Sequence, residues 1–165
     1  MLIKKFYIVL VISILSSCGY SLKGVINLPA DMKTICLEGG SYELLESFKK
    51  SFGNSSRVKF TETPENADLL IKIYNEKSDR RILSLNASGA ANDFELDYDF
   101  NFDVLDLKRK VLATNQMVSI KREYFNNQQA IIAKDNEENV IKSEMYRQAV
   151  GTLLNGVKVA LDNNK

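Results

Sequence analysis

The residues able to do chemistry are acidic, basic and hydroxyl side chains, because the sequence contains no histidine. Without imidazole, the chain cannot build a Ser-His or Cys-His nucleophile pair, a histidine-bearing zinc site or an imidazole general base. The 22 Lys and Arg residues nearly balance the 21 Asp and Glu residues. This balance disfavours a dedicated nucleic-acid binder, which is usually strongly basic. We therefore expect binding or assembly, and neither enzymatic activity nor nucleic acid as a partner.

The densest group of potential metal ligands is an acidic row at every second position of one segment. The row consists of Asp93, Glu95, Asp97, Asp99, Asn101 and Asp103. Side chains two residues apart on a strand are about 7 Å apart. That separation is too large for several of them to hold one cation with ligands at about 2.4 Å. We therefore predict no metal site and no cofactor, and interpret the row as a face for water or for a polar partner.

The other reactive group is the thiol of Cys18, which follows a typical export signal. Lys4 and Lys5 precede the apolar run Phe6 to Leu15, which is too short to span a bilayer as a helix. Leu15-Ser16-Ser17-Cys18 then resembles the lipobox of bacterial lipoproteins. The resemblance implies a signal peptide at residues 1–17 and an N-acyl and S-diacylglycerol lipid on Cys18. The lipid would anchor the protein to a membrane without spanning it.

The residues after Cys18 indicate where such an anchor is carried. In lipoproteins of this kind an aspartate after the cysteine favours retention in the inner membrane, so Gly19 is compatible with transport to the outer membrane. Cys36 is the other cysteine, and with Cys18 acylated it has no partner for an internal disulfide. We expect Cys36 to be a small core residue. Residues 18–31 are interpreted as a lipidated tether, and residues 32–162 as one domain.

Hydrophobic patterning predicts an α+β domain over residues 32–162. The expected elements are a strand at 32–37, a helix at roughly 42–52 capped by Ser41, a short extended piece at 58–61, a strand over 69–74 that can continue toward 85, strands at 94–104 and 111–121, and a last helix whose capping box is Asp135 and Glu138. Together they predict a two-layer sandwich with two helices on one face of a roughly four-stranded sheet. The sheet is mixed and mostly antiparallel, in the chain order β-α-β-β-β-α.

The long central strand carries the clearest pattern. An aromatic row alternates with the acidic row and consists of Phe94, Leu96, Tyr98, Phe100, Phe102 and Val104. Period two indicates a strand with one buried and one polar face. We interpret the aromatic row as core beneath the two helices, in preference to the lining of a groove for lipid tails.

Several short motifs, taken in order, resemble one family. They are Cys18-Gly19-Tyr20-Ser21-Leu22-Lys23, Leu28-Pro29, the long alternating strand, Arg122-Glu123-Tyr124-Phe125-Asn126, Ala133-Lys134-Asp135-Asn136-Glu137 and Glu144-Met145-Tyr146. Each motif alone is weak, but their order behind a lipobox resembles the LptE family of lipopolysaccharide-assembly lipoproteins. That family sits inside the LptD β-barrel of the outer membrane, assists folding of the barrel, and contacts the lipopolysaccharide that the pair inserts into the outer leaflet. The resemblance thus implies the partners LptD and lipopolysaccharide, and a lipid anchor on the periplasmic side.

The resemblance also implies lipopolysaccharide-binding residues. Lys134 falls on the lysine of the family's Ala-Lys-Asp-Asn motif, and Arg122 belongs to the basic-aromatic segment. The family's other basic contact falls near residues 86–87, which carry no charge here, so Arg80 and Arg81 are the candidate substitutes. The acidic row itself would repel phosphate. The alternative is that these four cations are solvated surface residues without a binding role.

Two other functions stay open from the sequence. A lipid-anchored periplasmic carrier of an acyl chain or glycolipid, acting without a barrel partner, predicts a cavity between the sheet and the helices. A lipoprotein hydrolase could use carboxylates without histidine, but the acidic row lies on an open face without a cleft motif.

Overall fold

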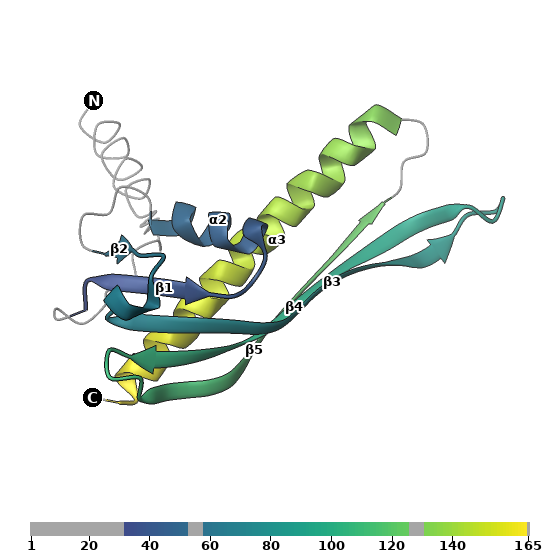
Figure 1. Ribbon diagram of the computed structural model, residues 1–165. Helices are drawn as coiled ribbons and strands as arrows, with labels where there is room; N and C mark the ends of the chain where they lie inside the picture. Colours follow the sequence, from purple (N-terminus) through teal and green to yellow (C-terminus); the bar gives the residue numbers. More distant parts are fainter. Residues whose placement is uncertain (1–31, 53–57, 126–130, 165) are drawn as a thin grey trace, which may run out of the picture.

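The computed structural model describes residues 32–52, 58–125 and 131–164, and for residues 131–136 it describes the backbone alone (Figure 1). The expected signal peptide, Cys18 and the whole tether therefore lie outside the described residues. Within the described part of the chain, no helix is long and apolar enough to cross a membrane.

A five-stranded mixed sheet forms one layer of the domain, in the spatial order β2-β1-β3-β4-β5. The strands are β1 (Thr34–Glu38), β2 (Lys59–Phe60), β3 (Leu69–Leu85), β4 (Ala91–Asp106) and β5 (Val111–Phe125). β1 pairs in parallel with β2 and β3, while β3, β4 and β5 form an antiparallel meander. The predicted α+β class is confirmed. The fifth strand arises because the short extended piece at 58–61 pairs with β1 through hydrogen bonds of 2.8 and 2.9 Å.

Helix α2 (Tyr42–Phe52) begins and ends where the sequence predicts. Ser41 Oγ accepts the Leu44 amide hydrogen bond at 3.3 Å, as expected of an N-cap. The carboxylate of Glu76 on β3 holds this cap in place, because it accepts bonds from the Ser41 amide at 2.6 Å and the Ser41 hydroxyl at 2.7 Å. The approach requires Gly39, at φ +81°, since a Cβ there would lie 2.5 Å from the Ile73 carbonyl oxygen.

Helix α3 (Ile131–Asp162) is longer than predicted and crosses the sheet diagonally (Figure 1). It begins before the expected capping box, so Asp135 and Glu138 lie inside the helix and the predicted cap is wrong. A short 3₁₀ turn, η1 (Pro64–Asn66), leads into β3. Both helices pack on the same face of the sheet, as predicted, and α3 also contacts α2.

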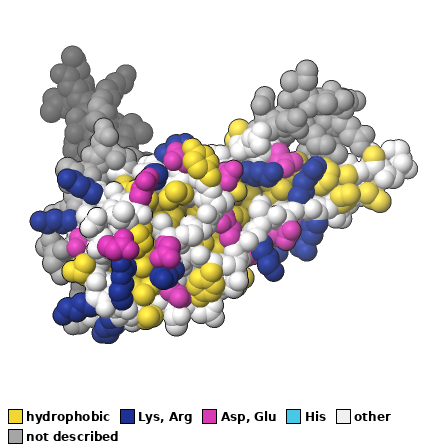
Figure 2. All heavy atoms as spheres, in the orientation of Figure 1, with side chains coloured by type: hydrophobic (Ala, Val, Ile, Leu, Met, Phe, Trp, Pro, Cys, Tyr) yellow, Lys and Arg dark blue, Asp and Glu magenta, His cyan; other side chains and the backbone are white. Residues whose placement is uncertain are grey.

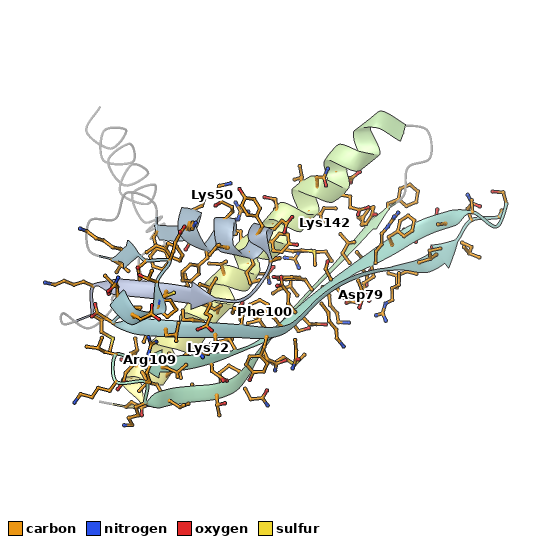
Figure 3. All side chains as sticks on the ribbon, in the orientation of Figure 1. Lys50, Lys72, Asp79, Phe100, Arg109 and Lys142 are labelled. Carbon is orange, nitrogen blue, oxygen red and sulfur yellow. The ribbon has the colours of Figure 1, made fainter. Side chains whose placement is uncertain are left out.

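The core lies between this sheet face and the helices. Every residue of the aromatic row is buried, with Phe100 at the centre (Figure 3). From α3, the core receives Met145, Ala149, Leu153 and Val157. The predicted core role of the aromatic row is confirmed. Cys36 is buried at 1% exposure, as expected, in a small cluster with Leu70 on the other side of the sheet.

Beyond β1 and β2 the three long strands continue as an arm, and the tip of the β3–β4 hairpin extends past the end of β5 (Figure 1). Its turn is closed by a 2.8 Å hydrogen bond from the Asn86 amide to the Ala90 carbonyl, and Gly89 supplies the positive φ of +81°. The arm carries Arg80 and Arg81 on β3, and Arg122 lies in the same part of the sheet on β5.

Candidate functional site

Two of the candidate cations, Arg80 and Arg122, share one row across the sheet. Arg80 on β3 is opposite Leu96 on β4, and Leu96 is opposite Arg122 on β5. Leu96 is buried beneath the helices, and directly opposed residues share a face. Both arginines therefore lie on the helix-covered face, about 10 Å apart at two strand spacings.

Arg81 lies on the opposite face and is engaged there. Its guanidinium forms an ion pair with Glu95 and a second one with Asp97 at 3.7 Å. The hydrogen bond that Arg81 donates to Glu95 and the two carboxylate charges raise the pKa of Arg81. The structure thus separates Arg81 from Arg80, as strand alternation requires.

Lys134 lies in the first turn of α3, not before it as the sequence suggested. Its side chain is outside the described residues. Its backbone position precedes Glu138 by one helical turn, because residues four apart share a helix face.

The Glu138 cluster forms where α3 passes over this row, and it consists of Glu138, Arg80, Tyr124 and Lys142. Lys142 Nζ lies 2.7 Å from Glu138 Oε1, and Arg80 Nε lies 3.5 Å from Oε2. The Tyr124 hydroxyl donates to Oε2 at 2.5 Å. Burial alone would raise the pKa of Glu138, but these three donors outweigh it and hold that pKa below its usual value.

Arg80 and Arg122 each contact neighbouring side chains or backbone. The Arg80 guanidinium stacks over the Phe94 ring, 3.8 Å from its centroid. Arg122 donates to the Gln148 side chain on α3 and, at 3.0 Å, to the Lys121 carbonyl. Each arginine is thereby held at a defined position beside α3, and the side chain of Arg80 remains 41% exposed.

The acidic row is less open to water than the sequence suggested. Glu95 is only 7% exposed, although neither α2 nor α3 covers its face. Cations from the flanking strands lie over the row: Lys121 Nζ on β5 is 2.9 Å from Asp97, and Arg81 on β3 pairs with Glu95. The Lys121 hydrogen bond, against an opposing effect of burial, lowers the pKa of Asp97. This face is thus a polar surface on which the charges of Glu95 and Asp97 are paired with the flanking cations.

Asp103, the last residue of the acidic row, is held by uncharged hydrogen-bond donors. Asp103 accepts hydrogen bonds from the Tyr74 hydroxyl at 3.0 Å, the Thr114 hydroxyl at 2.9 Å and the Asn115 amide at 2.8 Å. Among the described residues, no group of three His, Cys, Asp or Glu side chains is placed to hold a metal ion.

Hollows in the described part of the molecule lie mainly on its outside. A groove of about 700 Å³ lies between α2 and α3, and its exposed lining is more apolar than polar. The lining combines the apolar surface of Tyr42, Tyr146 and Val150 with the charged residues Glu43, Glu46, Lys50, Lys142 and Arg147. A second groove, of about 520 Å³, opens between β5 and α3, where Met117, Thr152 and Asn155 are among its lining residues. Deeper between the sheet and α3, the hollow beside Leu96, Tyr98 and Met145 measures only about 10 Å³. That volume is about enough for one water molecule.

Sequence reasoning missed Glu138, Tyr124 and Lys142 as members of one cluster. The spacing of Glu138 and Lys142, four residues apart, is typical of a helical ion pair and was the available signal. The contact with Arg80 had no such signal, since it depends on where α3 crosses β3. Figure 2 shows the result on the surface: positive and negative side chains alternate along the arm, and hydrophobic ones gather toward its tip. Lys142 is labelled on α3 in Figure 3.

The family model and the curated relatives that match this chain carry the same family name. Residues 32–156 match the family model described as LptE, lipopolysaccharide-assembly. The LPS-assembly lipoprotein LptE of Pectobacterium atrosepticum is 25% identical over 152 residues, covering 88% of this chain and 79% of that protein.

Solved structures with a similar fold include two further lipoproteins. The solution structure of lipoprotein B from Nitrosomonas europaea aligns with a TM-score of 0.65 and 25% identity, over 88% of this chain and 93% of that one. The crystal structure of rare lipoprotein B from Shewanella oneidensis aligns with a TM-score of 0.65 and 20% identity, over 79% of this chain and 98% of that one. The second likeness concerns the fold alone.

Proposed function

The chain belongs to the LptE family of lipopolysaccharide-assembly proteins, and from that premise we propose that it plugs the LptD β-barrel of the outer membrane. It is an LptE-family lipoprotein involved in lipopolysaccharide assembly. The proposal adds that it assists assembly of the barrel and contacts lipopolysaccharide directly while the glycolipid is inserted into the outer leaflet. The role is one of assembly and transport, without a catalytic step or a cofactor.

The plug proposal rests on the helix-free face, which is the sheet face opposite α2 and α3 in the described part of the chain. Three long strands present the acidic row and its paired cations Arg81 and Lys121 on this face. Large β-barrels keep polar interiors, because their inward residues face water. A stiff polar face of this kind suits a position inside such a barrel, since its charges are already partly compensated and lose little on approaching a polar wall.

The packed interior disfavours the alternative of an acyl-chain carrier. That function predicts a cavity between sheet and helices, but the hollow beside Leu96 and Met145 holds about 10 Å³. The groove of about 520 Å³ between β5 and α3 lies at the sheet edge, and polar side chains such as Gln116 and Asn155 help to line it. The outer groove between α2 and α3 is large enough, but charged side chains such as Glu46 and Arg147 line it. Tyr42, Tyr146 and Val150 give this groove apolar surface, but an acyl chain there would also cover the charged groups, and burying charges against hydrocarbon is costly.

The anchor and the lipopolysaccharide contacts complete the proposal. We infer that residues 1–17 are removed, that Cys18 carries the lipid, and that residues 18–31 tether the domain to the periplasmic side of the outer membrane. Arg80 and Arg122 are favoured as phosphate contacts because they share one sheet face. Lys134 is proposed from the family resemblance. Arg81 is the weakest of the four candidates, since Glu95 and Asp97 already engage it.

A pull-down of the tagged, full-length lipoprotein from outer membranes in gentle detergent tests the plug proposal. Mass spectrometry of the eluate is expected to show a large β-barrel protein at about equal stoichiometry. Recovery of the folded protein alone and in good yield would contradict the proposal and favour a carrier that acts without a barrel. Tagged protein carrying Cys18→Ala is the matched control, because it should not reach the membrane.

A further inference from the structure

Glu138 is a carboxylate held by three donors from three different elements. Arg80 comes from β3, Tyr124 from β5, and Lys142 from α3 itself. This arrangement differs from an ordinary ion pair on a helix surface, which joins only two residues of one helix. The donors surround one small volume at the junction of the arm, the edge strand and the last helix.

The cations of this cluster are open to solvent while the carboxylate is not. The side chains of Arg80 and Lys142 are 41% and 42% exposed, whereas that of Glu138 is 16% exposed. Tyr124 is buried, and its hydroxyl group bonds to Glu138. An anion arriving from solvent would therefore meet the two cations first.

The donor set matches phosphate better than carboxylate. A guanidinium, an ammonium and a phenol hydroxyl together offer several hydrogen-bond donors and two positive charges. A carboxylate has one charge and two oxygens, whereas a phosphate monoester carries three acceptor oxygens and about −1.5 to −2 charge. The cluster is thus an anion site that the chain's own carboxylate occupies.

We propose that Glu138 is a built-in competitor, which fills this anion site until a phosphate group of the glycolipid displaces it. The inference rests on the proposed lipopolysaccharide contact and deepens it by assigning a residue that opposes binding. When the site is empty of ligand, Glu138 neutralises Arg80 and Lys142 and ties α3 to the arm. When phosphate enters, the Glu138 side chain turns to solvent and the two cations and Tyr124 bind the phosphate.

Replacing Glu138 with Gln tests the competition. The full-length lipidated protein in non-ionic detergent is titrated with bisphosphorylated lipid A, with its dephosphorylated form, and with inorganic phosphate. E138Q is expected to bind bisphosphorylated lipid A about three- to tenfold more tightly than wild type, as removal of one competing charge would allow. Its affinity for the dephosphorylated form should not change.

A matched control separates competition from a general change in charge. Glu144 lies on the same helix, is 56% exposed, and pairs only with Arg147 among the ion pairs of the described residues. E144Q removes the same charge and should leave lipid A affinity unchanged. Equal tightening in both variants would overturn the assigned role of Glu138.

Other outcomes separate this inference from the proposed function. Wild-type binding of lipid A together with unchanged or weaker binding by E138Q overturns the competitor role and leaves direct contact intact. Absence of binding in both proteins overturns direct contact itself. A gain for inorganic phosphate but not for lipid A overturns the assignment to a glycolipid and leaves a site for free phosphate.

A second pair of variants covers the case in which E138Q does not fold, as a thermal melt would reveal. R80Q and K142Q should then each weaken lipid A binding, relative to K108Q in the exposed turn between β4 and β5. Unchanged affinity in both R80Q and K142Q would overturn the site.

Discussion

Gly156 on α3 offers a direct test of how closely the helix packs on the sheet. A Cβ at this position would lie 2.8 Å from Cζ of Phe102, a residue that is only 2% exposed. At Gly151, on the same helix, a Cβ would meet no heavy atom within 4 Å. The two positions thus differ in crowding while sharing a helix.

The magnitudes follow from these contacts. Replacing a helical glycine with alanine stabilises a helix by about 1 kcal/mol. Forcing an extra carbon into a packed core costs about 1–3 kcal/mol. G151A should therefore raise the free energy of unfolding by about 1 kcal/mol, while G156A should leave it unchanged or lower it by up to about 2 kcal/mol.

Guanidinium unfolding of the full-length protein, followed by circular dichroism, measures both variants against wild type. The difference between them isolates the contact with Phe102, because the helix-propensity gain is common to both. Equal stabilisation by G151A and G156A would refute the close packing of α3 on β4. It would also reopen the carrier alternative, since the sheet–helix interface would then have room to spare.

Three further predictions concern the anchor, the binding site and acid stability. Cys18→Ala should leave an unlipidated, mislocalised precursor, and normal acylation of the variant by mass spectrometry would refute the lipobox. Lys134→Glu should weaken lipopolysaccharide binding in a titration without changing the thermal melt; unchanged affinity removes Lys134 from the site. Hydrogen bonds from the Lys33 amide and from Thr34 lower the pKa of Asp68, so its stabilisation is present above its unfolded pKa and is lost as pH falls through the lower folded pKa. Wild type should therefore lose more stability than Asp68→Asn between about pH 5 and 3, and parallel losses in acid denaturation curves would contradict this.

Much of the fold was predictable because period-two and helical patterns are local. The aromatic row defined β4 and its buried face, and Ser41 defined the start of α2. The pairing of β2 with β1 was not predictable from two residues, since so short a strand carries no periodicity. The predicted start of α3 was also wrong, because the spacing of Asp135 and Glu138 fits a helix cap as well as the interior of a helix.

The candidate site was less predictable because it depends on strand register and on a helix crossing. Alternation alone separates Arg80 from Arg81, but it does not say which of them faces α3. That assignment depends on the register shift between Tyr74 and Lys77, after which Arg81 is opposite Glu95. The pairing of the acidic row with flanking cations has the same origin. The Glu138 cluster additionally requires α3 to pass over β3 and β5.

Cross-linking from the helix-free sheet face tests the central claim most directly. Ser119 lies exposed on β5 opposite Asp99 of the acidic row, so a photo-reactive amino acid at 119 reports on what touches this face in the cell. The plug account predicts a covalent product with the LptD barrel. Efficient cross-linking to other envelope proteins, with no barrel product while the protein is folded and membrane-bound, would contradict it.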